Sequence, residues 1–236
     1  MKSYIDELDR NIFNFVEYEG YDDRYPSLSM QAFSSDFYDE IRHASRRLFQ
    51  IFCKAAKVFQ MAPDDFARNM DMPDNLIPYL HKSNALGLPT WLSRFDFVLD
   101  VNGNLRMVEL NADTPCFLIE SYYANEVAAN YVGRKHPNIE CRKELHTFLK
   151  RMYDVVLSAK YGRNQYESMR ANRESLPKDP FVFSCFHDYF EDYGTTQFLM
   201  KELKTACPEA DTRFISFYDM KIDDEGIPLE DGSHAT

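Results

Sequence analysis

Glycine is scarce in this 236-residue sequence, which contains 8 glycines, and no glycine-rich phosphate-binding motif is present. Neither the GxxxxGKS or GxxxxGKT loop nor the GxGxxG loop occurs, which argues against a P-loop enzyme and a classical Rossmann enzyme. The GxSxG motif of serine hydrolases is also missing. Functional residues must therefore be sought in other side-chain patterns.

Paired cysteines and metal-ligand histidine motifs are absent as well. The 5 cysteines are odd in number, widely spaced and form no CxxC pair, a pattern typical of a reducing cytosol. The 6 histidines show no HExxH spacing, which argues against a zinc site. The N-terminus MKSYIDELDR has no apolar signal core, and no run of about 18 apolar residues occurs. We therefore expect a soluble, cytoplasmic protein that does not enter a membrane.

Basic surface is also scarce, because the formal net charge is −11. Nonspecific binding to nucleic acid or to anionic membranes needs basic surface, so the charge argues against both kinds of partner. A cationic or amine partner is more compatible with it, although many globular proteins are simply acidic. With 44% hydrophobic residues, the chain can bury a substantial core in one domain or two small ones.

Helical periodicity is strongest in two long segments. One amphipathic helix is predicted from Ser34 or Ser35 up to the interruption at Pro63, and another over 138–160. Segments 63–70 and 73–83 are shorter helical candidates that open with proline and acidic residues. The polar segment 161–179 is predicted to be a loop or linker. Strand, helix and strand patterns over 180–186, 191–207 and 212–219 predict a β-α-β unit.

The segment RFDFVLDVNGNLRMVELN, residues 94–111, predicts a β-hairpin. Apolar and other residues alternate on both sides of Asn102-Gly103, the strongest short-range signal for a two-residue turn. Such a turn places Val101 opposite Asn104, and every other cross-strand pair follows from that one. The predicted apolar face pairs Phe95 with Leu110 and Phe97 with Val108.

The opposite face of the predicted hairpin is polar, with Asp96 facing Glu109 and Arg94 facing Asn111. Two directly opposed carboxylates repel each other unless a positive charge lies between them. Arg94 supplies part of that charge. Asp, Glu and the Asn carbonyl offer only oxygen ligands, which suit magnesium better than zinc. The alternatives are a magnesium site beside an arginine and an ordinary solvated face with salt bridges.

The segment after the hairpin predicts a helix capped by Asp113 or Thr114, with Pro115 in its first turn. The N-terminus of such a helix favours an anionic group near the predicted metal site. Cys116 would lie in that first turn, where its pKa could be lowered. With no partner residue nearby in the sequence, we favour a role for Cys116 in the wall of a substrate site over one as a nucleophile.

Three motifs in the sequence resemble the synthetase domain of the glutathionylspermidine synthase family. They are RFDF (94–97), VELNADTPC (108–116) and, more weakly, HDYFED (187–192). The resemblance extends from about residue 30 to the end and corresponds to the N-terminal portion of the family pattern. It implies an ATP-grasp-like acid-amine ligase that uses ATP and Mg²⁺. The family pattern continues past residue 236 to the ATP-binding lysines, so a missing C-terminal half is an expected partner.

The resemblance assigns roles to particular residues. It implies that Arg94 stabilises the transferring phosphate and that Asp96, Glu109 and Asn111 bind magnesium. By the same motif, Thr114 and Cys116 contact a glutathione-like acid substrate. Serine can stand in that part of the family motif, so Cys116 is a departure that bears on the identity of the acid.

The acidic pair Glu191-Asp192 faces a polyamine-like substrate if the resemblance holds there. The alternative is a pair of acids favoured by the dipole at the start of a helix.

We therefore expect an α/β fold, incomplete and ATP-grasp-like, in which a mostly antiparallel central sheet contains the 94–111 hairpin and is flanked by helices. Residues 1–160 form the helical and metal-hairpin part, 161–179 a linker, and 180–236 a small α/β part truncated at its C-terminus. The predicted function is ATP-dependent amide formation through an acyl phosphate. The alternative is a truncated or split homologue that binds a ligand or partner without ATP-driven activity. A metal-dependent hydrolase is a third class, but no base or second metal cluster is visible in the sequence.

Overall fold

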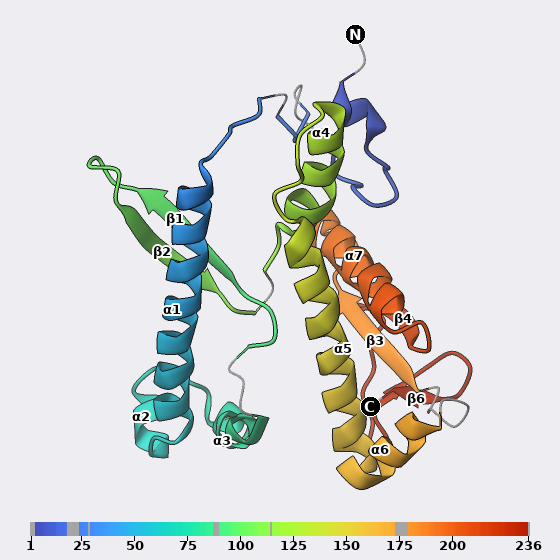
Figure 1. Ribbon diagram of the computed structural model, residues 1–236. Coiled ribbons are helices and arrows are strands. Elements are labelled where there is room, and N and C mark those ends of the chain that lie inside the picture. Colours follow the sequence, from blue (N-terminus) through green and yellow to red (C-terminus); the bar gives the residue numbers. More distant parts are fainter. Residues whose placement is uncertain are drawn as a thin grey trace. The chain divides into compact units, whose positions relative to one another are not determined.

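A computed structural model describes residues 3–17, 24–27, 29–86, 90–113, 115–172 and 179–235 (Figure 1). The chain divides into two compact units, which we describe separately. The hairpin unit comprises Met30–Pro115, and the core unit comprises Met1–Ser29 together with Cys116–Thr236. This division differs from the expected one at residue 160, because the second long helix belongs to the same unit as the β-α-β segment.

The hairpin unit is built on the long amphipathic helix α1, Ser35–Gln60. Its start is the predicted one, since the Ser34 hydroxyl accepts a hydrogen bond from the Phe37 backbone N–H at 3.1 Å. The shorter helices also form where they were predicted. The remaining elements of the unit are α2 (Asp64–Arg68), η2 (Asp74–Leu76), α3 (Ile77–Ser83), η3 (Asn84–Leu86), β1 (Arg94–Leu99) and β2 (Leu105–Asn111).

Strands β1 and β2 form the predicted antiparallel hairpin, but its loop is longer than expected. The Asp100 N–H donates to the Asn104 carbonyl at 2.9 Å, so three residues form the loop instead of Asn102-Gly103 alone. The shift of one residue is undone by a bulge at Val108, because Phe97 pairs with Met107 while Asp96 pairs with Glu109. The predicted pair of Phe97 with Val108 is therefore wrong.

The α/β class is confirmed, whereas the larger central sheet is not formed by the described residues. Within them, the hairpin is a sheet of its own with the strand order β1-β2, and the other two sheets also have two strands each. The apolar side of the hairpin packs instead on helix α1, where the rings of Phe52 and Phe95 lie 5.9 Å apart between centroids.

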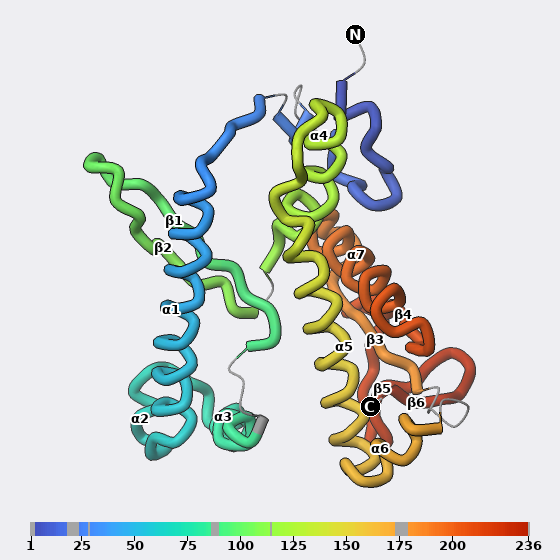
Figure 2. The backbone as a smooth tube through the Cα atoms, in the orientation of Figure 1, coloured from blue at the N-terminus to red at the C-terminus, as the bar shows by residue number. Residues whose placement is uncertain are grey.

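The core unit contains the predicted β-α-β segment. Strands β3 (Pro180–Cys185) and β4 (Asp211–Ser216) pair in parallel, and helix α7 (Phe190–Ala206) connects them (Figure 2). The other elements of the unit are η1 (Tyr4–Glu7), η4 (Ile119–Ala124), α4 (Asn125–Tyr131), α5 (Ile139–Tyr161), α6 (Arg163–Ala171), β5 (Ile227–Pro228) and β6 (His234–Ala235).

Helix α5 supplies the central apolar face of the core unit. Its buried side chains recur every four residues, the spacing that places them on one face of a helix. They are Leu145, Leu149, Tyr153 and Leu157. Phe13 and Val16 from the N-terminal segment and Leu203 from α7 are fully buried in the same core.

A buried carboxylate links α5 to α7. The Glu202 side chain is 1% exposed and accepts two hydrogen bonds from Arg142, at 3.1 and 2.7 Å, and one contact from His146 at 2.5 Å. Burial alone would raise the pKa of Glu202, but the Arg142 and His146 contacts outweigh it and the pKa is lowered. A buried charge is tolerated only when it is paired in this way, so these contacts fix α7 against α5.

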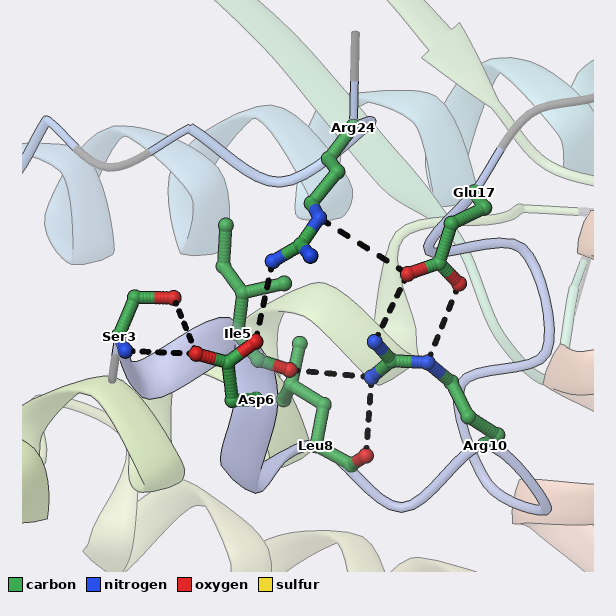
Figure 3. A network of polar contacts seen from close by, with 7 residues as sticks. All are labelled: Ser3, Ile5, Asp6, Leu8, Arg10, Glu17 and Arg24. Atoms are coloured by element: carbon green, nitrogen blue, oxygen red, sulfur yellow. Dashed lines mark hydrogen bonds and ion pairs between the residues drawn. The ribbon is translucent and has the colours of Figure 1, made fainter. Parts of the chain in front are cut away.

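Arginine side chains also hold the N-terminal segment together (Figure 3). Arg10 and Arg24 both contact Glu17, and Arg24 reaches Asp6 at 3.1 Å. Arg10 donates as well to backbone carbonyls of the first turn, at 3.0 and 2.9 Å. The ion pairs are exposed and contribute little energy individually, but together they link the first turn to Glu17 and Arg24.

The prediction of a loop over 161–179 is wrong for its first part. Helix α6 occupies Arg163–Ala171 because its Tyr166 is buried and its hydroxyl donates to Asp154 of α5 at 2.7 Å. Arg170 pairs with the same carboxylate at 3.1 Å. Contacts with α5 therefore stabilise a helix that the weak hydrophobic periodicity of this segment did not predict.

No helix in the described ranges is long and apolar enough to cross a membrane.

Gly194 provides a test of the packing between α7 and the N-terminal segment. A β-carbon at this position would lie 2.7 Å from the Asn14 Oδ1 atom and 2.9 Å from the Ile119 Cδ1 atom, inside contact distance. In an open helix, replacing glycine by alanine stabilises by about 1 kcal/mol, but overpacking costs about 1–3 kcal/mol. We expect Gly194→Ala to lower the free energy of unfolding, measured by urea denaturation.

The double variant Asn14→Ala, Gly194→Ala is the control, because it removes one of the two clashing atoms. Its loss of stability should be smaller than the sum of the two single losses. A stabilising effect of Gly194→Ala alone would contradict the packing.

Candidate metal and phosphate site on the hairpin

The hairpin brings the four predicted polar residues together on one face, and we call them the polar square. Arg94 Nε lies 2.7 Å from Asp96 Oδ1, and its Nη2 lies 3.0 Å from Oδ2, so the guanidinium forks across the carboxylate. The Asn111 amide nitrogen lies 3.3 Å from Asp96 Oδ2 and 2.6 Å from Glu109 Oε1. The predicted cross-strand pairs Asp96–Glu109 and Arg94–Asn111 are confirmed.

The register of the square depends on Asp100, which the sequence reasoning did not single out. Its Oδ1 accepts the backbone N–H groups of Asn102 and Asn104, both at 2.9 Å, and this widens the loop. Gly103 completes the loop with a φ of 79°. An Asp followed two residues later by a turn residue is the local signal for this arrangement. The wider loop would have put the acids out of step without the bulge at Val108.

The charges on the square compensate one another. The hydrogen bonds from the Arg94 guanidinium lower the pKa of Asp96, so this carboxylate is ionised at neutral pH. Arg94 and Asp96 are 34% and 36% exposed, which leaves the pair open to solvent and to a ligand. The hydrogen bonds therefore hold the carboxylate of Asp96 in place, while solvent still reaches it.

The donor set of the square suits a hard divalent ion, because Asp96, Glu109 and the Asn111 carbonyl supply oxygen only. In the structure the Asn111 nitrogen faces both acids, so its amide would have to turn to present the oxygen. Among the described residues, no group of three or more His, Cys, Asp or Glu side chains has the geometry of a metal site. Any ion on the square would therefore keep water or ligand oxygens in its shell.

The chain beyond the hairpin does not form the predicted helix at Pro115. Phe117 has a φ of 84°, a left-handed conformation that interrupts any helix, and the π-helical turn η4 begins at Ile119. The predicted start of this helix is therefore wrong, and so is the prediction that its positive dipole end lies next to the square. Asp113 precedes no helix, and Thr114 lies outside the described residues.

Cys116 lies in the core unit and contacts the start of helix α7. Its Sγ donates a hydrogen bond to Asp192 Oδ1 at 3.1 Å. Burial raises the pKa of Cys116 to about 12, and the negative charges of Asp192, Glu191 and Glu120 add to the effect. The thiol is therefore neutral and acts as a donor, which disfavours the alternative of a reactive thiolate.

Glu191 and Asp192 occupy the first turn of α7, where the helix dipole favours acids. Glu191 is half-buried and lies close enough to influence Cys116 electrostatically. The structure thus brings two predicted substrate residues, Cys116 and Glu191, into one neighbourhood.

The fold and the hairpin define an α/β protein that carries two opposed carboxylates and an amide beside an arginine on one face of the hairpin. The chain matches the family model described as glutathionylspermidine synthase preATP-grasp over residues 4–234. It belongs to this family, and the membership relates it to ligases. The match begins well before residue 30, where the motif resemblance was expected to start. No curated protein sequence matches the chain.

The raised pKa of Cys116 leads to a prediction about its reactivity. At pH 8 its thiolate fraction is very small, so iodoacetamide should modify Cys116 more slowly than an unperturbed thiol. Asp192→Asn removes a negative charge and a charged acceptor, so it should lower the pKa of Cys116 and speed the modification several-fold. Peptide mapping by mass spectrometry measures the rate for each cysteine.

Asp188→Asn is the matched control, because it removes a carboxylate of the same segment that makes no described contact with Cys116. Rapid alkylation of Cys116 in the parent protein would show that the thiol is ionised and would contradict the assignment.

Proposed function

We propose that the protein acts in ATP- and magnesium-dependent formation of an amide from a carboxylic acid and an amine, as a ligase of the glutathionylspermidine synthase type. The observation that carries the proposal is the polar square, in which a forked arginine lies beside two opposed carboxylates on one face of a hairpin. The family membership over residues 4–234 supports the same reaction class.

In the proposed reaction, ATP transfers its γ-phosphoryl group to the carboxylate of the acid substrate, which releases ADP and forms an acyl phosphate. The amine then attacks the acyl carbon, and the C–O bond to phosphate breaks to release inorganic phosphate and a proton. The magnesium ion supplies positive charge that neutralises phosphate oxygens when it is bound. Asp96, Glu109 and Asn111 would hold it. Arg94 orients and stabilises the transferring phosphoryl group through its forked donors. The chain therefore contributes by positioning and electrostatic stabilisation, which carry most of the catalysis of phosphoryl transfer.

The substrates are proposed to be a glutathione-like acid and a polyamine-like amine. Cys116 contacts the acid as a neutral donor, and Thr114 is proposed to contact it as well. Glu191 faces the amine, because a half-buried carboxylate in the first turn of α7 attracts a protonated ammonium group.

A second candidate function is a binding module without ATP-driven activity of its own. The observation that favours it is the set of hydrogen bonds within the square, where Arg94 donates to both oxygens of Asp96 and the Asn111 amide donates to Glu109. In that case the square is a set of surface salt bridges that stabilises the hairpin.

Divalent ions should separate the two functions. If the square holds magnesium, Asp96→Asn and Glu109→Gln should each weaken Mg²⁺ or Mn²⁺ binding about 10-fold or more, since each removes one of two charged ligands. Titration calorimetry with MnCl₂, with and without a nucleoside triphosphate, measures the dissociation constant of the ion. Nucleotide phosphates should tighten binding by completing the ion's shell.

Asp100→Asn is not a suitable control because Asp100 sets the loop, so Asp74→Asn, an exposed acid of the same unit, serves instead. If the double variant Asp96→Asn, Glu109→Gln binds the ion as tightly as the parent, the site lies elsewhere.

Arg94→Lys distinguishes catalysis from structure. Lysine keeps the charge but loses the fork, so the melting temperature should change little, because an exposed pair contributes about 0–1 kcal/mol. The rate of amide formation in a ligase that contains this chain should fall about 10²-fold or more, the effect of losing one electrostatic contact in the transition state. Unchanged turnover with a much lower melting temperature would make Arg94 structural.

A further inference from the structure

Four exposed aromatic side chains gather in the core unit around Phe186, and we call them the aromatic cluster. The ring centroid of Phe186 lies 5.0 Å from that of Tyr218, 5.1 Å from that of Phe217 and 5.9 Å from that of Tyr189. The four residues remain 40–61% exposed. Single exposed apolar residues need no explanation, but a contiguous patch of them usually marks a binding surface.

The cluster lies at the carboxyl ends of two parallel strands, because Phe186 follows β3 and Phe217 follows β4. In open α/β structures, ligands bind at this edge of the sheet. Backbone hydrogen bonds hold the loops in place: Phe217 N–H donates to the Cys185 carbonyl at 3.1 Å, and Tyr189 N–H to the Phe186 carbonyl at 3.2 Å. The rings are therefore presented by ordered turns.

Hydrogen bonds hold the side chains of the cluster in place, and the Asp188 carboxylate gives the cluster a negative charge. The Tyr218 hydroxyl donates to Asp188 Oδ2 at 3.1 Å, and this bond raises the pKa of Tyr218. The Ser216 hydroxyl contacts both His187 Nδ1 at 2.8 Å and the Tyr218 N–H at 3.3 Å. In the described part of the chain, Asp188 forms no ion pair with a lysine, arginine or histidine.

These features favour a cationic ligand over a neutral one. A purely apolar ligand would desolvate the Asp188 carboxylate without pairing it, which is unfavourable. An organic cation satisfies Asp188 and is attracted to the faces of the surrounding rings. The donation from Tyr218 to Asp188 adds electron density to the Tyr218 ring and strengthens that attraction.

The size of the cluster favours a small ligand over a protein. An aromatic side chain buries about 150–250 Å² when fully covered, so four half-exposed rings offer roughly 400 Å². A stable protein interface needs about 800 Å² on each partner. We propose that the aromatic cluster is a binding site for a small organic ammonium ion, formed by Phe186, Tyr189, Phe217 and Tyr218 with the Asp188 carboxylate.

This site uses none of the side chains assigned to amide formation, so it stands or falls independently of the proposed function. Exposed cation–π contacts are weak individually, and a single ammonium group should therefore bind with a dissociation constant on the order of millimolar.

The test is an NMR titration of the full chain, labelled with ¹⁵N in Phe and Tyr, with tetramethylammonium chloride. We expect saturable shifts at Phe186 and Tyr218. Tyr218→Leu and Tyr189→Leu, at exposed positions where the fold tolerates leucine, should each weaken binding about 3- to 10-fold. Asp188→Asn should weaken it as well.

Three controls decide the outcome. Sodium chloride at equal ionic strength should cause no saturable shift, and tert-butanol, a neutral molecule of similar shape, should bind more weakly than the cation. Tyr79→Leu, at an exposed tyrosine of the hairpin unit, should leave the affinity unchanged. Equal binding of tert-butanol, or no saturable shift with tetramethylammonium, would overturn the proposal.

Discussion

Two carboxylates held directly opposite each other on adjacent strands require a compensating positive charge, and the polar face of the hairpin is organised around this requirement. Asp96 and Glu109 face each other only because a three-residue loop and a bulge at Val108 shift the register in opposite senses. In the structure Arg94 supplies the positive charge at Asp96, and the neutral Asn111 amide donates hydrogen bonds to both acids. A metal ion bound between Asp96 and Glu109 would supply the positive charge instead. The proposed chemistry requires these carboxylates to release Arg94 and Asn111 and to bind the ion.

The core unit also contains a carboxylate whose negative charge must be compensated, but this carboxylate is buried away from water. Glu202 is 1% exposed, so its charge depends on Arg142 and His146, and these contacts hold α5 and α7 in one arrangement. The hairpin acids are about one-third exposed or more, and their partners can change at little cost. Burial therefore separates a carboxylate that fixes the fold from carboxylates that can bind a ligand.

The region around Cys116 shows how burial, together with nearby negative charges, keeps a thiol neutral by raising its pKa. A cysteine at a helix start would tend toward a thiolate, but Phe117 delays the helix and Asp192 accepts the thiol proton's hydrogen bond. The result is a neutral hydrogen-bond donor beside acids, and not a nucleophilic thiolate. In the aromatic cluster, at the carboxyl ends of β3 and β4, the Asp188 carboxylate likewise accepts a hydrogen bond from a neutral donor, the Tyr218 hydroxyl.

The sequence by itself determined the elements whose signal is local. The start of α1 at its Ser34 cap, the β-α-β segment and the hairpin itself follow from periodicity and turn residues. The pairing of Asp96 with Glu109 agrees with the prediction because the longer loop and the bulge at Val108 shift the register by equal and opposite amounts. Only the tertiary structure decided the rest. The hairpin loop depends on Asp100, which accepts two backbone N–H groups. Helix α6 depends on the burial of Tyr166 against α5. The helix after the hairpin begins only beyond Phe117, whose backbone is left-handed. The loop is set by short-range hydrogen bonds to one side chain, α6 by a contact with another helix, and the helix after the hairpin by one backbone conformation. None of these changes the hydrophobic periodicity from which the elements were predicted.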